Sequence, residues 1–173
     1  MNIPERLTWA IEQLAVQPHD EILEIGCGTG VAAALICAQL TTGHLTAIDR
    51  SPTMIRAAQK RNQACIESGK AIFLPTSLAE MRSRHGCFNK ALAVNINLFW
   101  LQPVSELEVL KQVLKPTGEV CLIFQPPVAS KLHGIAEACS HFLLKHGFSD
   151  ISVDYPALSP MTVVCVRATL TLV

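Results

Sequence analysis

The sequence has few charged residues, no long hydrophobic run and no secretory signal. Only 16% of its 173 residues are charged, 50% are hydrophobic and the mean hydropathy is +0.34. This composition excludes a disordered chain, because disorder needs low hydrophobicity and high net charge. No apolar run approaches the ~20 residues that span a bilayer; the candidates Val31–Leu40 and Ala91–Leu101 are about ten residues long and contain polar side chains. The N-terminus lacks the basic and apolar segments of a signal peptide, so we expect a soluble protein without a membrane partner.

The chain also has no excess of charge of either sign. Lys plus Arg and Asp plus Glu each number 14, so the formal net charge is zero. The nearest approach to a basic patch is Arg50, Arg56, Lys60 and Arg61. Its spacing fits a solvated helix face better than a phosphate track, and we expect no nucleic-acid partner. A neutral chain lacks the repulsion that opposes self-association, which permits a homodimer.

Paired cysteine motifs and histidine motifs are absent as well. The seven cysteines form no CxxC and mostly have apolar neighbours, which indicates reduced, buried thiols and a cytoplasmic location. The six histidines form neither an HxH nor an HExxH pattern, so we expect no bound metal.

Apolar, strand-like runs alternate with helical segments along the whole chain. We expect strands at 21–25, 44–49, 71–74, 91–95, 119–124, 151–155 and 162–169. We expect helices at 3–16, 29–40, 52–66, 77–83, 104–114 and 130–146. This alternation indicates βαβ units and a mainly parallel sheet, hence a Rossmann-like three-layer α/β/α sandwich.

The last two strands differ from the others because only Pro156–Pro160 separates them. They therefore pair as an antiparallel hairpin, which predicts a seven-stranded, mainly parallel sheet with its last strand antiparallel. We expect residues 1–173 to form a single domain, with 1–18 as an N-terminal helix.

The first strand leads directly into a glycine-rich turn, EIGCGTG at 24–30. Ligands of open α/β sheets bind beyond the carboxyl ends of the strands. The pattern is not the dinucleotide GxGxxG, whose third glycine would fall at Val31. Glu24 would repel a pyrophosphate and attract a cofactor that carries an ammonium group. Asp49 ends the second strand 19 residues after Gly30, where a carboxylate can accept both ribose hydroxyls.

These features resemble the class I S-adenosylmethionine-dependent methyltransferase family. The resemblance is carried by EIGCGTG at 24–30, AIDRSPTM at 47–54 and VLKPTGEVCLIF at 113–124, the last with Thr117 where the family has a glycine. It covers nearly the whole chain. It implies a cofactor-binding α/β domain with S-adenosylmethionine (SAM) as cofactor and S-adenosylhomocysteine (SAH) as product.

The resemblance also implies roles for the matching residues. Glu24 would hold the methionine amino group, and Asp49 would accept the ribose diol. The methionine and ribose would be lined by Gly26, Cys27, Gly28 and Gly30. The ribose and adenine would be flanked by Arg50 and Met54, although Met54 fits the core equally well. Cys27 is better explained as a small residue that fills space than as a nucleophile.

Two further places in the chain match the family less closely. The acid that usually contacts the adenine amino group has no counterpart at Thr76 and Ser77, so a hydroxyl or backbone group would replace it; these residues could instead cap the short helix that follows. Asn95 and Asn97, which end the fourth strand, would lie near the sulfonium and the acceptor.

Catalysis of methyl transfer needs little from the protein besides alignment, because the sulfonium is already activated. A general base is needed only if the acceptor arrives protonated. Asn95 and His133 are the candidate catalytic residues; His133 fits a surface or capping role as well. The segment Leu98–Trp100 indicates an apolar small-molecule acceptor, although core packing explains it equally.

Three functions compete on this evidence. The first is SAM-dependent methyl transfer to a small molecule. The second is a catalytically silent SAM-binding module that serves a protein partner. The third is an NAD(P)-dependent oxidoreductase, which Val31 and Glu24 disfavour, as does the absence of a Tyr-x-x-x-Lys pair, since Tyr155 is the only tyrosine.

Overall fold

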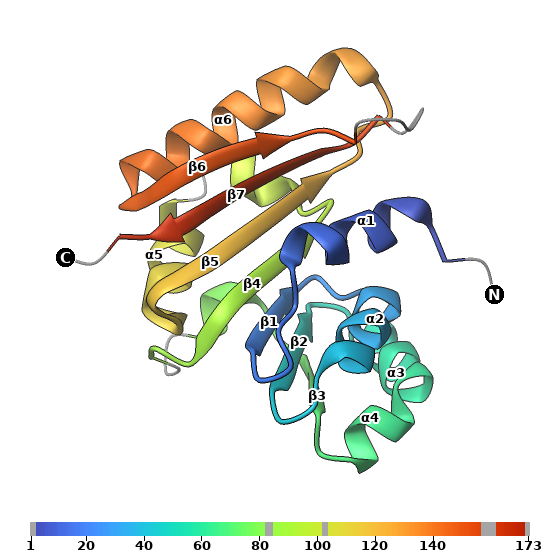
Figure 1. Ribbon diagram of the computed structural model, residues 1–173. Helices are drawn as coiled ribbons and strands as arrows, with labels where there is room; N and C mark the ends of the chain where they lie inside the picture. The colour runs from blue at the N-terminus through green and yellow to red at the C-terminus, as the bar shows by residue number, and fades with distance from the viewer. Residues whose placement is uncertain (1–2, 82–84, 102–103, 157–161, 172–173) are drawn as a thin grey trace.

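Seven strands form one sheet in the computed structural model, which describes residues 3–81, 85–101, 104–156 and 162–171 (Figure 1). The strands are β1 Glu21–Ile25, β2 His44–Asp49, β3 Ala71–Pro75, β4 Phe88–Val94, β5 Leu114–Phe124, β6 Phe148–Asp154 and β7 Val164–Leu170. Their order is β3-β2-β1-β4-β5-β7-β6. The strands β1 to β5 pair in parallel, whereas β7 is antiparallel to both β5 and β6. The predicted mainly parallel sheet with a reversed last strand is confirmed.

Helices cover both faces of this sheet (Figure 1). One face carries α1 Glu5–Leu14, α2 Val31–Gln39, α3 Pro52–Arg61 and α4 Gln63–Glu67, and the other carries α5 Val104–Val113 and α6 Leu132–Lys145. Short helical turns are η1 Leu78–Glu80, η2 Asn97–Trp100 and η3 Ala129–Lys131. Successive strand residues point to opposite faces, so Ile22 joins one hydrophobic cluster and Leu23 the other.

The segment 52–66, expected as one helix, forms two helices that meet at Asn62. The Asn62 side chain is buried, and its Nδ2 donates to the carbonyl of Ala58 at 2.9 Å and to that of Gly30 at 3.0 Å. The backbone of Asn62 leaves helical geometry, with φ −108° and ψ 25°. The break therefore ties the end of α3 to the glycine-rich turn.

Several strands begin earlier than their apolar runs indicate. β4 includes the buried Lys90. Its burial is tolerated because its ammonium group forms an ion pair with Asp20 at 3.2 Å and donates to the carbonyl of Ala15 at 2.7 Å. β5 begins at Leu114 instead of Glu119, because Leu114 already pairs with Phe88 across an irregular step in the register. Long-range partners of Lys90 and Leu114 thus start these strands earlier than hydrophobic patterning alone predicts.

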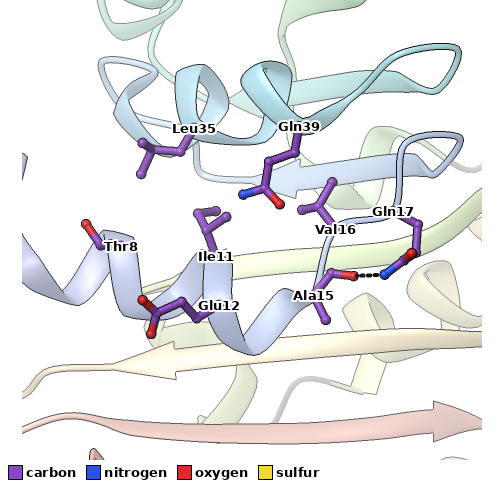
Figure 2. Close-up of a pocket in the computed structure, with 8 residues that line it drawn as sticks. All are labelled: Thr8, Ile11, Glu12, Ala15, Val16, Gln17, Leu35 and Gln39. Atoms are coloured by element: carbon purple, nitrogen blue, oxygen red, sulfur yellow. Dashed lines mark hydrogen bonds between the residues drawn. The ribbon is translucent and has the colours of Figure 1, made fainter.

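Helix α1 packs on α2 and leaves a hollow of about 400 Å³ between them (Figure 2). Ile11 of α1 and Leu35 of α2 line it, and at its edge the Gln17 Nε2 donates to the carbonyl of Ala15 at 3.0 Å. At the other end of α1, the Arg6 Nη1 lies 3.4 Å from the Gln125 Oε1, just beyond β5. The first turn of α1 therefore reaches the carboxyl edge of the sheet.

The cysteines agree with the expectation of reduced thiols. All seven are free, and five are buried: Cys27, Cys37, Cys121, Cys139 and Cys165.

Across the ranges described above, no helix is long and apolar enough to cross a membrane, and no three His, Cys, Asp or Glu side chains gather as a metal site.

Candidate functional site

The turn between β1 and α2 is held against the end of β2 by backbone hydrogen bonds. The N–H groups of Gly26 and Cys27 both donate to the carbonyl of Ile48, at 2.8 and 3.0 Å. All three glycines of the turn have positive φ. Among the described residues no side chain caps the N-terminus of α2, so the turn presents backbone N–H groups at the carboxyl edge of the sheet.

Gly28 and Gly30 serve different purposes in this turn. A Cβ on Gly30 would lie 2.5 Å from the Asn62 Nδ2 and 2.9 Å from the Ala58 Cβ, so this glycine permits close packing of the turn on α3. A Cβ on Gly28 would meet no atom of the described part of the chain within 4 Å. The space beside Gly28 is therefore open to a ligand.

This difference predicts unequal costs for two matched substitutions. Gly30→Ala should destabilise the protein by about 3 kcal/mol or more, because it combines a steric clash with a positive φ of 73°. Gly28→Ala should cost only about 1–2 kcal/mol, from its positive φ alone. Urea unfolding of both variants measures the difference; equal costs would contradict the packing role of Gly30.

Asp49 organises the turn from the end of β2. Its Oδ2 accepts from the Gly28 N–H at 2.9 Å, and its Oδ1 accepts from the Ser51 N–H at 2.8 Å. Ser51 in turn caps α3, because its Oγ accepts from the Met54 N–H at 3.3 Å. The carboxylate is only partly buried and therefore remains accessible to a ligand.

Glu24 is a buried carboxyl group that lacks a partner. Its side chain is 4% exposed, and its Oε2 has no hydrogen-bond partner among the residues that the structure describes. Burial, together with the charge of Asp49, raises the pKa of Glu24 to about 8. A buried acid of this kind lowers the stability of the folded protein unless a cation or a hydrogen-bond donor pairs with it. Such an unpaired buried acid is typical of a ligand site.

A pocket of about 400 Å³ opens beside the turn, and we call it the Asp49 pocket. Residues that line it come from the ends of β1, β2 and β3, from the segment after β4 and from α5: Ile25, Gly26, Ile48, Asp49, Arg50, Thr76, Ser77, Leu78, Ala79, Ile96, Leu98 and Glu106. The structure thus brings Gly26, Asp49, Arg50, Thr76 and Ser77 together, as the sequence predicts. Met54 is 39% exposed and is not among the lining residues.

Cys27 lies in the turn, in surroundings that disfavour its thiolate form. It is buried, and burial, together with the charges of Glu24 and Asp49, raises the pKa of its thiol to about 12. This agrees with its interpretation as a small filler.

Two acids near the Asp49 pocket are not among the residues predicted from the sequence. The Glu80 Oε2 accepts from the Thr76 Oγ1 at 3.0 Å and from the Ser77 Oγ and N–H at 2.8 and 2.7 Å. These donors lower the pKa of Glu80, the Ser77 N–H most of all. The spacing Ser77-x-x-Glu80 is a capping box and could have revealed this contact. The second acid, Glu106, lines the pocket from α5, and no local motif marks it.

A second pocket, of about 380 Å³, lies on the other side of the segment after β4, and we call it the Asn95 pocket. It is lined by Asn95, Asn97, Trp100, Phe124, Gln125, Pro126, Pro127, Lys131 and Ile135. Asn95 adopts a positive φ of 56°, and its Oδ1 accepts from the Gln125 N–H at 2.7 Å, which links the ends of β4 and β5.

His133, the other candidate catalytic residue, is exposed on α6, 3.1 Å from Glu137, and is not among the lining residues of either pocket.

Comparison with known proteins places this geometry in a family. Residues 22–118 match the family described as methyltransferase domain. The uncharacterized methyltransferase YdaC of Bacillus subtilis is 24% identical over 164 residues, which cover 92% of this chain and 88% of YdaC. A malonyl-[acyl-carrier protein] O-methyltransferase of Herminiimonas arsenicoxydans is 33% identical over 116 residues, 67% of this chain and 40% of that protein.

Solved structures share the fold. A SAM-dependent O-methyltransferase from Thermotoga maritima has a TM-score of 0.79 at 12% identity, covering 99% of this chain and 67% of that one. The family match at 22–118 spans more than half of the chain and contains the glycine-rich turn, Asp49, Thr76, Ser77 and Asn95. The chain therefore belongs to the class I S-adenosylmethionine-dependent methyltransferases.

Proposed function

We propose that this protein transfers the methyl group of SAM to a small-molecule acceptor, with the cofactor bound between Glu24 and Asp49. The observation that carries this proposal is the buried Glu24 carboxyl, whose Oε2 lacks a partner beside an open glycine turn. The ammonium group on the methionine part of bound SAM would supply the cation that Glu24 lacks. The residues present therefore fit SAM.

The part of the Asp49 pocket lined by Thr76 and Ser77 fits an adenine without the family's usual acid. The hydroxyls of Thr76 and Ser77 both donate to Glu80, and the Ser77 oxygen also accepts from the Glu80 N–H, so each oxygen keeps a lone pair that can accept from an amino group. Glu106 adds a carboxylate to the same pocket, and its Oε2 accepts from the Ser105 Oγ at 2.8 Å. We assign these groups to the adenine amino group.

This assignment predicts that Glu106 contributes to base selectivity. Replacing Glu106 with Gln should reduce the preference for SAH over its inosine analogue, which has a carbonyl in place of the amino group, by about 10-fold. Glu108→Gln on the same helix is the matched control, because Glu108 faces His146 and Lys111 instead of the pocket. Calorimetric titration measures both affinities; an unchanged preference in Glu106→Gln would remove Glu106 from the site.

The bound cofactor supplies an electrophilic methyl group attached to a cationic sulfur. The protein's contribution is alignment and exclusion of water. The β1–α2 turn and Asp49 fix the cofactor, and the segment after β4 forms the wall that the two pockets share. Asn95 is held rigidly by its bond to the Gln125 N–H, so it can position the acceptor beside the methyl group.

A small acceptor is supported by the size of the Asn95 pocket and by the relatives. A pocket of about 380 Å³ lies within the ~300–1,000 Å³ range of small-molecule sites. The O-methyltransferases from Herminiimonas arsenicoxydans and Pyrenophora dematioidea methylate oxygen, which makes an oxygen nucleophile the first class to test here.

Transfer of a labelled methyl group tests the proposal. The purified protein, incubated with tritium-labelled SAM and a cell extract separated by size, should label the low-molecular-weight fraction and release SAH. Asp49→Ala should abolish the labelling. Label confined to the macromolecular fraction would contradict a small-molecule acceptor, and SAH binding without any transfer would favour the catalytically silent module.

A further inference from the structure

The two pockets are separated by the four residues that follow β4. Ile96 and Leu98 line the Asp49 pocket, whereas Asn95 and Asn97 line the Asn95 pocket. Asn95 has a positive φ and Asn97 begins the helical turn η2, and along this bent segment alternate residues line the cofactor pocket and the acceptor pocket. A molecule in the Asn95 pocket lies next to the bound cofactor.

The Asn95 pocket contains hydrogen-bond donors and a cation but nothing that accepts a proton. Its polar lining consists of the amides of Asn95, Asn97 and Gln125, the indole N–H of Trp100 and the ammonium group of Lys131. In the portion of the chain that the structure covers, no Asp, Glu, His, Cys or Tyr lines it. An acceptor whose nucleophilic atom arrives protonated would find no base there.

One cation, Lys131, lines this pocket, and a second, Arg6, contacts one of its lining residues. Lys131 lies at the start of α6, whose N-terminus adds a partial positive charge. Arg6 reaches from α1, with its Nη1 3.4 Å from the Oε1 of the lining residue Gln125. The nearest acid along α6, Glu137, is engaged by His133.

Two buried donors near the pocket also lack acceptors. These are the Nε of Arg6 and the Nε1 of Trp100, which have no hydrogen-bond partner among the described residues. Trp100 lines the pocket and Arg6 contacts its rim through Gln125. Buried donors without acceptors lower stability, and of these two Trp100 is the one that lines the pocket and could donate to an anionic ligand there.

We propose that the acceptor is a carboxylic acid with an apolar body and that the product is its methyl ester. The proposal rests on the proposed function above. A carboxylate oxygen attacks the methyl carbon as the carbon–sulfur bond breaks, and the electron pair of that bond passes to sulfur. The sulfonium becomes a neutral thioether, the carboxylate becomes a neutral ester, and no proton moves.

Other oxygen and nitrogen nucleophiles fit this pocket less well. A phenol or an alcohol must lose a proton during transfer, and an amine is a cation at neutral pH that Lys131 and Arg6 would repel. A carboxylate is already ionised at neutral pH and is attracted by both cations. The apolar body of the acceptor would pack on Trp100, Phe124 and Pro126.

Alkaline lability of the product distinguishes these classes. The protein is incubated with tritium-labelled SAM and octanoate, phenylacetate or the anionic pool of a small-molecule extract, alongside octanamide, octanol, octylamine and the neutral and cationic pools. Methyl esters release volatile labelled methanol on mild alkaline treatment, whereas ethers and methylamines do not. We expect alkali-volatile label from the carboxylic acids or the anionic pool only.

Substitutions at Lys131 test the recognition itself. Lys131→Met should raise the KM for the carboxylate acceptor by about 10-fold or more with little change in kcat, and Lys131→Arg should restore most of the loss. Lys145→Met, an exposed lysine at the far end of α6, should leave both constants unchanged. SAH affinity should be the same in all three variants.

The outcomes separate this proposal from the proposed function. Alkali-stable label, or label from the neutral or cationic pools alone, would overturn the carboxylate assignment and leave methyl transfer standing. A protein that binds SAH but yields no alkali-volatile label from any acid or from the anionic pool would also overturn it. Failure to bind SAH would instead overturn the proposed function. An unchanged KM in Lys131→Met would remove Lys131 from the site.

Discussion

Replacing Glu24 with Gln should stabilise the cofactor-free protein above pH 8 by about 2–4 kcal/mol and weaken SAM binding by about 30-fold or more. The buried carboxyl has a pKa of about 8 in the folded protein, against an ordinary value of 4.5. Between these values the folded protein keeps a proton that the unfolded chain releases. Stability therefore falls as pH rises from 4.5 to 8, and the full loss is present above pH 8.

Glutamine removes this loss because it has the same shape and cannot ionise. Below pH 4.5 the carboxyl is protonated in both states, so variant and parent should have similar stability there. Binding weakens because the ammonium group of the cofactor loses its counter-charge. Urea unfolding across this pH range, with SAH titration at each pH, measures both effects.

Asp20→Asn is the matched control for a buried acid without a ligand role. Asp20 is as buried as Glu24, 4% exposed, but it forms an ion pair with the buried Lys90. Its neutralisation should destabilise the protein by about 3 kcal/mol and leave SAH affinity unchanged. Stabilisation by Glu24→Gln at all pH values, or an unaltered pH dependence, would contradict the assignment of the raised pKa to Glu24.

Asp49→Ala should lower SAM affinity by about 100-fold, which corresponds to about 3 kcal/mol. The change removes the proposed acceptor for the ribose diol and also frees the Gly28 and Ser51 N–H groups. Because the charge of Asp49 helps raise the pKa of Glu24, the pH range over which stability falls should also move to lower pH.

A deoxyribose analogue separates the two roles of Asp49. The 2′,3′-dideoxy analogue of SAH should bind the parent protein at least about 10-fold more weakly than SAH does. In Asp49→Ala the two ligands should bind equally. A variant that still prefers the ribose form would show that another group holds the diol and that Asp49 only organises the turn.

Local patterns predict most of this fold. The glycine turn, the strands β1 and β2 and the antiparallel last strand follow from residue periodicity and from the short connection at Pro156–Pro160. The insertion of β7 between β5 and β6 has no local signal, because it depends on long-range strand pairing. The helix break at Asn62 and the early start of β5 depend likewise on contacts with Gly30 and Phe88, which are distant in sequence.

The site was predictable where it depends on the glycine motif and on strand ends. Gly26, Asp49, Thr76 and Ser77 meet at the Asp49 pocket because the carboxyl ends of parallel strands share one edge of the sheet. The contribution of Glu106 comes from a helix that packs over that edge, so its position is set by tertiary packing. Ile96 and Asn95 line different pockets, and predicting this from the sequence would require the path of the backbone after β4.

Calorimetric titration of the protein with SAH tests the placement of the cofactor between Glu24 and Asp49. The geometry predicts saturable one-to-one binding well below about 1 mM, accompanied near neutral pH by release of a proton from Glu24 as the ammonium group binds. Titrations in buffers of different ionisation enthalpy reveal that proton, and Glu24→Gln should abolish its release. Absence of binding at about 1 mM SAH would contradict the placement of the cofactor between Glu24 and Asp49. Binding that releases no proton, and whose affinity is the same in Glu24→Gln as in the parent protein, would contradict it too.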